Sequence, residues 1–153
     1  MRKLFAMLVF IGFSGPALAL ETIYTSLTDC RELEFLEEGY FSRWACDAPE
    51  GWQVELVEED ARSYLILSHH GMTHSLQNEM QNEFTFGAFP GVGKLAEWRM
   101  GPQGPEALIV RMHYMREDQP KSVLFVFNLR GVKPVLAGTT TSNEQARRIA
   151  DQP

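Results

Sequence analysis

Two pairs of alternating charged residues could build an anion site. Glu97 and Arg99 are two positions apart, as are Arg111 and His113, so on β-strands the members of each pair share a face. If the two strands are neighbours, the four side chains form one cluster, with Arg62 beside it. Convergent arginines bind carboxylates and other anions, and a Glu–His pair can exchange protons in a hydrolase-type reaction. Cross-strand ion pairing on a solvated sheet face is the plainer interpretation.

A histidine-rich tract offers a second kind of chemistry. Three of the four histidines lie within six residues, with a methionine among them. The candidate metal ligands are His69, His70, Met72 and His74. Imidazole and thioether groups suit copper, and imidazole alone suits zinc. Gly71 disfavours the helix that would align these side chains, and no carboxylate ligand is evident, so a solvated polar loop is the alternative. The sequence indicates no other cofactor.

The first nineteen residues have the organisation of a signal peptide. Arg2 and Lys3 precede an apolar run over 4–13, and the small residues Ala17 and Ala19 predict cleavage after Ala19. Removing residues 1–19 takes away two positive charges, so the remaining chain is more acidic than the net charge of −6 of the whole. This balance argues against a nucleic acid or an anionic membrane as partner, because both require clustered Lys and Arg.

Both cysteines lie beyond the predicted cleavage site. Cys30 and Cys46 are an even pair, and in an oxidising exported compartment such a pair forms a disulfide. A redox site would use a Cys-x-x-Cys motif at a helix start, and a structural zinc site would need more ligands. No cysteine directly follows residue 19, so we expect no lipid anchor.

The candidate residues must be positioned mainly by strands. Alternating or apolar runs bounded by turn residues predict strands over 52–58, 62–68, 95–100, 106–115 and 122–129. The glycines at 91–93 and 101–105 are interpreted as hairpin connections. Asp29 and Glu32 resemble a capping box that opens a short helix over 29–39, whereas the aromatic residues Phe35, Tyr40 and Phe41 also suit extended chain. Ser142 can cap a helix over 143–150. Together these patterns predict one α+β, mainly β domain over 20–153. We expect an antiparallel meander curled into a sandwich or small barrel, with a short N-terminal helix and a C-terminal helix.

The order of several short motifs resembles that of small exported proteins of alphaproteobacteria, a group with no characterised activity. The motifs are Asp29-Cys30, Trp44-Ala45-Cys46, Glu59-Asp60-Ala61-Arg62, Glu97-Trp98-Arg99, Ile109-Val110-Arg111 and Ala150-Asp151. That group has a further cysteine near its last strand, whereas residues 135–138 here contain none. The resemblance implies a periplasmic location and supplies no activity.

These observations favour a non-enzymatic periplasmic binding module. Its partner would be a periplasmic protein or a small anionic ligand, as for inhibitors of cell-wall hydrolases and for immunity proteins. Copper or zinc binding by the histidine tract is one alternative. A hydrolase-type enzyme acting through the Glu97 and His113 face is the other.

Overall fold

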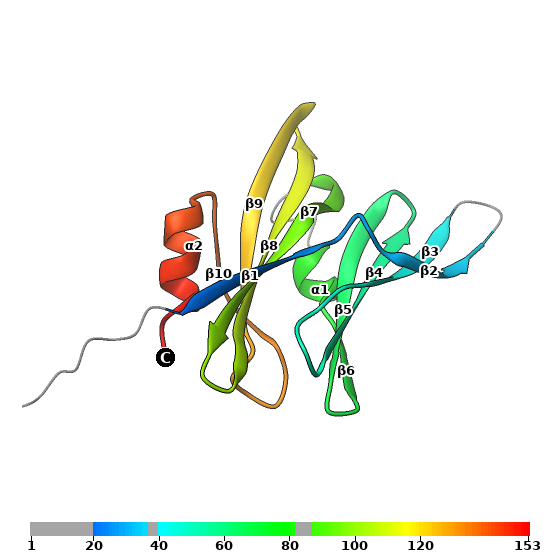
Figure 1. Cartoon of the computed structure of the whole chain (residues 1–153). Helices are drawn as coiled ribbons and strands as arrows, with labels where there is room; N and C mark the ends of the chain where they lie inside the picture. Colours follow the sequence, from blue (N-terminus) through cyan, green and yellow to red (C-terminus); the bar gives the residue numbers. More distant parts are fainter. Residues whose placement is uncertain (1–19, 37–39, 82–86) are drawn as a thin grey trace, which may run out of the picture.

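The computed structural model describes residues 20–36, 40–81 and 87–153, which form two five-stranded antiparallel sheets packed face to face (Figure 1). The predicted signal peptide lies outside the described residues. Within the described ranges, no helix is long and apolar enough to cross a membrane. The arrangement is sandwich-like, which is one of the two architectures predicted from the sequence. Among the described residues, neither sheet closes into a barrel, because the two edge strands of each sheet do not pair with each other.

One sheet, which we call the helix-covered sheet, has the order β1-β7-β8-β9-β10. Its strands are β1 (Glu21–Ser26), β7 (Ala88–Gly101), β8 (Gly104–Arg116), β9 (Gln119–Asn128) and β10 (Val135–Thr140). The helix α2 (Asn143–Ala150) packs on the face that points away from the other sheet (Figure 1).

The other sheet, which we call the meander sheet, contains five strands that are consecutive in the chain. They are β2 (Arg31–Phe35), β3 (Phe41–Cys46), β4 (Trp52–Glu59), β5 (Arg62–His69) and β6 (Met72–Ser75), followed by the short helix α1 (Gln77–Met80). This sheet is therefore inserted between β1 and β7, which are hydrogen-bonded neighbours.

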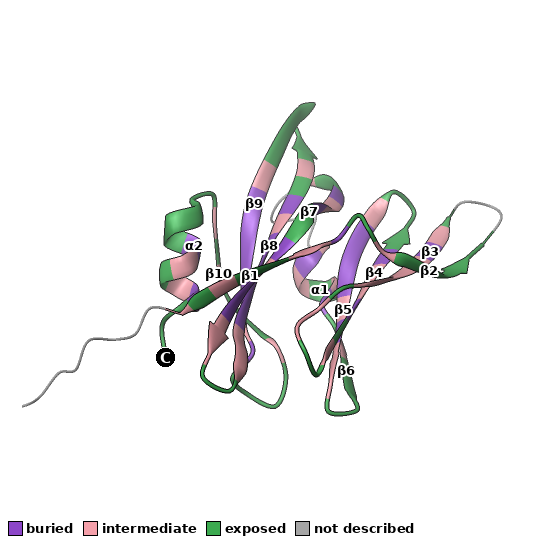
Figure 2. Ribbon diagram, in the orientation of Figure 1, coloured by how far each residue is buried: buried purple, intermediate pink, exposed green. Residues whose placement is uncertain are grey.

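Strand alternation divides the buried residues into two cores. Trp98, Phe125 and Phe127 point toward the meander sheet and pack with Leu65 and Leu67 in the main core. The intervening residues of the same strands form a second core beneath α2, which comprises Ala107, Ile109, Leu124, Val126, Ala146 and Ala150. Figure 2 shows buried segments on β5, β8 and β9, whereas α2 and β2 are largely exposed. The helix-covered sheet is thus covered on both faces.

The two predicted helices had different outcomes. The C-terminal helix is confirmed as α2, and the Ser142 Oγ accepts a hydrogen bond from the Gln145 N–H at 3.3 Å. The predicted N-terminal helix is wrong, because Arg31–Phe35 form strand β2, paired with β3. All five β2 side chains are exposed, so no apolar stripe is buried that would favour a helix there.

The predicted connections between strands also had different outcomes. The 59–62 connection is a tight hairpin whose central residues, Asp60 and Ala61, have positive φ values of 49° and 61°, as a type I′ turn requires. Gly101 and Gly104 pair at the β7–β8 hairpin, as predicted. The turn predicted at 91–93 is wrong, because these residues lie inside the long strand β7.

The predicted cysteine pair is confirmed at disulfide distance, with Cys30 and Cys46 Sγ atoms 2.07 Å apart. Cys30 lies just before β2, and Cys46 is the last residue of β3. The pair therefore holds the β2–β3 hairpin at its open end.

Candidate anion-binding site

A bulge in β7 creates the site. Val92 pairs with Met112 and Ala96 with Val110, so three residues of β7, 93–95, lie opposite the single residue Arg111 of β8. Such bulges redirect side chains and are common beside functional sites. The bulged backbone keeps a partner, because the Lys94 carbonyl accepts a hydrogen bond from the Leu27 N–H at 2.8 Å.

Gly93 permits the close approach of the two strands at this bulge. A Cβ atom at Gly93 would lie 3.0 Å from the Arg111 carbonyl oxygen and 3.1 Å from the Arg111 Cβ. The glycine therefore belongs to the packing of β7 against β8, not to a turn.

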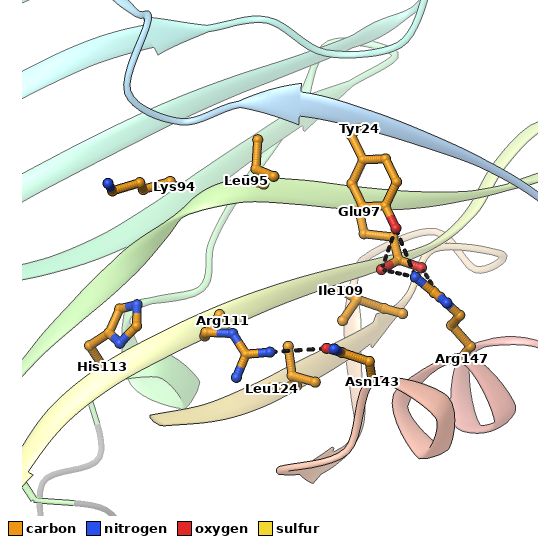
Figure 3. Close-up of a pocket in the computed structure, with 10 residues that line it drawn as sticks. All are labelled: Tyr24, Lys94, Leu95, Glu97, Ile109, Arg111, His113, Leu124, Asn143 and Arg147. Carbon is orange, nitrogen blue, oxygen red and sulfur yellow. Dashed lines mark hydrogen bonds and ion pairs between the residues drawn. The ribbon is translucent and has the colours of Figure 1, made fainter. Parts of the chain in front are cut away.

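The bulge opens a hollow of about 480 Å³ on the α2 side of the sheet (Figure 3). We call it the bulge hollow; it lies between the β7 bulge, β8, the first turns of α2 and β1. Its lining residues are Tyr24, Lys94, Leu95, Glu97, Ile109, Arg111, His113, Leu124, Asn143 and Arg147. This volume is within the range of small-molecule sites.

Arg111 is the central cation of the bulge hollow. Its Nη1 donates to the Ser122 Oγ at 3.2 Å, and its Nη2 donates to the Asn143 Oδ1 at 2.9 Å. Both acceptors are neutral, and no carboxylate of the described chain forms an ion pair with this guanidinium. Since a guanidinium has five N–H groups, most of its donors and all of its charge remain for another partner.

Lys94 and His113 lie at the same end of the bulge hollow (Figure 3). Both side chains are exposed. In the part of the chain that the structure describes, neither side chain forms a hydrogen bond or an ion pair. The ammonium of Lys94 and the imidazole of His113 are therefore free to contact a ligand held by Arg111.

The opposite end of the bulge hollow is an ion pair that is already complete. The Arg147 Nε donates to the Glu97 Oε1 at 2.6 Å, and its Nη2 donates to the Tyr24 hydroxyl at 2.7 Å. The Tyr24 hydroxyl in turn donates to the Glu97 Oε2 at 3.3 Å. The hydrogen bond and charge of Glu97 raise the pKa of Arg147 further above its usual value. The carboxylate of Glu97 is thereby neutralised by its own partner.

The balance of charge makes the bulge hollow positive within an acidic chain. Two arginines and one lysine line it, against a single carboxylate, whereas the chain as a whole has a net charge of −6. A local excess of positive charge in a concave site attracts anions.

Arg99 lies outside the bulge hollow and fastens the end of α2. Its Nε and Nη2 donate to the two carboxylate oxygens of Asp151 at 2.9 and 2.7 Å, and its Nη1 also contacts the Thr22 Oγ1. The Arg99 side chain is only 7% exposed. Such a bidentate pair fixes the geometry of both partners.

The structure therefore brings together only part of the charged cluster that the sequence predicts. Glu97, Arg111 and His113 line one hollow, while Arg99 is turned to Asp151. Arg62 does not join them, because it lies on β5 and lines a separate hollow with Gly91 of β7.

Seven lining residues are absent from the site predicted from the sequence. Four of them are polar, Tyr24, Lys94, Asn143 and Arg147, and three are apolar, Leu95, Ile109 and Leu124. Asn143 and Arg147 are four apart on α2, so the sequence predicts that they share a helix face. The sequence does not predict which strands that face contacts.

The histidine tract forms the hairpin between β5 and β6, which we call the histidine hairpin (residues 69–74). His69 stacks on Trp52 with ring centroids 4.2 Å apart, and the His70 ring lies 3.8 Å from that of His69. Met72 pairs with His69 across the hairpin, and His74 pairs with Leu67. Among the described residues no three His, Cys, Asp or Glu side chains are grouped to hold a metal ion. Metal binding at this hairpin stays a prediction.

Comparison of the chain with protein-family models, with curated proteins and with solved structures gave no match.

Proposed function

We propose that this protein is a periplasmic binding module whose bulge hollow takes a small anionic ligand. The observation that carries the proposal is Arg111, a guanidinium that lines the hollow and is held by two neutral acceptors, Ser122 and Asn143. A cation that is oriented but not neutralised within its own chain is preorganised for an anion.

Binding without turnover is favoured over hydrolysis by the state of Glu97. A general base needs a free carboxylate close to the proton that it removes. Here Arg147 and Tyr24 contact both Glu97 oxygens, and Arg99 Nη1 lies 3.9 Å from Oε1. Of the Glu–His pair that a hydrolase would use, the carboxylate is therefore committed to holding β1, β7 and α2 together.

Two features support export. Residues 1–19 have the pattern of a signal peptide, and Cys30 and Cys46 lie at disulfide distance, a pairing that oxidising compartments maintain. In the periplasm the site would meet small anions that pass the outer membrane.

The test compares an anion with its neutral counterpart. Calorimetric titration with hexanoate, hexanamide and inorganic phosphate should give saturable binding for at least one anion and none for hexanamide. Replacing Arg111 by Gln should weaken anion binding at least tenfold, since a hydrogen bond to a charged group contributes about 1.5–3 kcal/mol.

The matched control is Arg148→Gln, on the same helix. Arg148 is 68% exposed, forms an ion pair with Glu144 at 3.6 Å and does not line the bulge hollow. Equal anion affinity in the Arg111→Gln variant, the Arg148→Gln variant and the unaltered protein would contradict the proposal. Circular dichroism and the conservative variant Arg111→Lys separate loss of the site from loss of the fold.

A further inference from the structure

We infer that the ligand of the bulge hollow is an amphipathic monoanion: one anionic head group joined to a short apolar body. The inference rests on the proposed function and assigns the chemistry of its ligand. It follows from the two different ends of the bulge hollow and from the apolar surface between them (Figure 3).

The head group belongs at the end formed by Lys94, Arg111 and His113. Arg111 is oriented there by Ser122 and Asn143, so its remaining N–H groups are fixed in direction. A carboxylate matches this planar fork, and an alkyl sulfate offers the same single negative charge with similar oxygen acceptors. Both head groups are oxyanions that are joined to the rest of the ligand by one bond.

The apolar body belongs on the surface that continues from this end. Ile109 and Leu124 lie between Arg111 and the Glu97–Arg147 pair (Figure 3) and are buried, with only 3% and 5% of their surface exposed. Leu95 lines the same hollow from the β7 bulge and is 54% exposed. An exposed leucine next to an apolar floor gains free energy when a hydrocarbon segment covers it.

The other end limits both the length and the charge of the ligand. The hydroxyl of Tyr24 and the charges of Glu97 and Arg147 already satisfy one another. A longer hydrocarbon would have to remove water from this ion pair, which costs free energy. A second anionic group placed there would face the Glu97 carboxylate.

A series of straight-chain carboxylates tests the inference on the full exported protein. Titrations with acetate, butyrate, hexanoate, octanoate and decanoate should show affinity rising about two- to fourfold per methylene and then levelling off. Adipate, which adds a second carboxylate to the six-carbon chain, should bind at least tenfold more weakly than hexanoate. Alkyl sulfates of the same lengths distinguish a carboxylate from a sulfate head group.

The substitution Leu95→Ser isolates the apolar contribution. Because Leu95 is exposed, the variant should fold, and we expect the gain in affinity per methylene to fall. Val132→Ser is the matched control, since Val132 is 79% exposed and does not line the bulge hollow. It should leave the whole series unchanged.

The outcomes separate this inference from the proposed function. Binding of anions that depends on Arg111 but not on chain length, or tighter binding of adipate than of hexanoate, overturns the amphipathic ligand and leaves the anion site standing. Absence of binding by every anion, inorganic phosphate included, overturns both.

Discussion

The bulge hollow and the histidine hairpin gather candidate residues in opposite ways. The lining of the bulge hollow comes from β1, β7, β8, β9 and α2, and runs from Tyr24 to Arg147 in the chain. The histidine hairpin holds three histidines within six residues. Yet the dispersed set converges on one concave surface, whereas the adjacent histidines form no group of three that could hold a metal within the described ranges.

The difference follows from strand geometry. Neighbouring residues on a strand point to alternate faces, and although the His69 and His70 rings meet at the hairpin turn, no third ligand joins them among the described residues. His69 is further occupied by its stack on Trp52. Sheet register, a bulge and a docked helix bring distant residues together instead.

The largest expected effect comes from breaking the attachment of α2. In Asp151→Ala the Arg99 guanidinium, whose side chain is 7% exposed, loses its bidentate partner. Among the described carboxylates, only the longer contact of Arg99 Nη1 with Glu97 Oε1, at 3.9 Å, would remain, so the free energy of unfolding should fall by about 2–4 kcal/mol. Hexanoate affinity should also fall, because α2 carries Asn143 and Arg147. Urea denaturation followed by tryptophan fluorescence measures the first effect, and calorimetry the second.

The control for that experiment is Glu144→Ala on the same helix. Glu144 is 81% exposed and pairs with the similarly exposed Arg148 at 3.6 Å, so we expect a change below about 0.5 kcal/mol. Equal stabilities of the two variants would mean that Arg99 and Asp151 do not hold α2 in place.

Filling the space at Gly93 tests the bulge. The added methyl group of Gly93→Ala would press on the Arg111 carbonyl and Cβ, and overpacking of this kind costs about 1–3 kcal/mol. Hexanoate affinity should fall with it, because Arg111 must move. Gly131→Ala, whose Cβ would meet only the Lys133 carbonyl oxygen at 3.8 Å, should change neither measurement. If Gly93→Ala binds hexanoate normally, the bulge does not position Arg111.

A smaller effect is expected from acid at the histidine hairpin. Burial, and then the charge of His70, lower the pKa of His69 below its usual value, which is about 6.5. The unfolded chain therefore takes up a proton where the folded hairpin does not, so this stability is present above about pH 6.5 and is lost as the pH falls below it.

Two measurements follow this effect. An NMR titration should place the midpoint of His69 below 6.5, and thermal unfolding between pH 7.5 and 5 should show a smaller acid loss in His69→Gln than in the unaltered protein. A His69 midpoint at or above 6.5 would contradict the prediction.

The smallest effect is expected from removing the hairpin histidines together. Replacing His69, His70 and His74 by Asn should leave hexanoate affinity unchanged, because none of them lines the bulge hollow. Calorimetry with copper and zinc on the same pair of proteins tests the metal prediction. If the unaltered protein binds metal saturably and the replacement abolishes that binding, the histidine hairpin is a metal site. The contrast drawn here between the histidine hairpin and the bulge hollow would then be wrong.

Local patterns predicted much of the fold. Trp52 and Val54 alternate with polar residues, and the apolar run of β9 is covered on both faces, so periodicity was informative for β4 and β9. It failed for β2, since a strand with every side chain exposed carries no burial pattern. It failed again at Gly93, because a glycine that permits strand contact looks the same in sequence as a glycine in a turn.

The candidate site was predictable only where strand parity decides it. Glu97 is on β7, Arg111 and His113 are on β8, and these strands are joined by a short hairpin, so their common face follows from alternation and pairing. The bulge places Lys94 at the site, and the packing of α2 on the sheet places Asn143 and Arg147 there. Neither the bulge nor the packing of α2 can be predicted from the local sequence pattern.

The insertion of the meander sheet between β1 and β7 bears on the order of folding. Glu21 lies opposite Met100, so pairing these strands closes a loop that contains the whole meander sheet, at an entropic cost that grows with loop length. The meander strands and the β7–β9 hairpins pair locally, and local pairing is fast. We therefore expect β1 to dock late. Because β1 carries Tyr24, the wall of the bulge hollow would be completed only when nearly all of the chain is already folded.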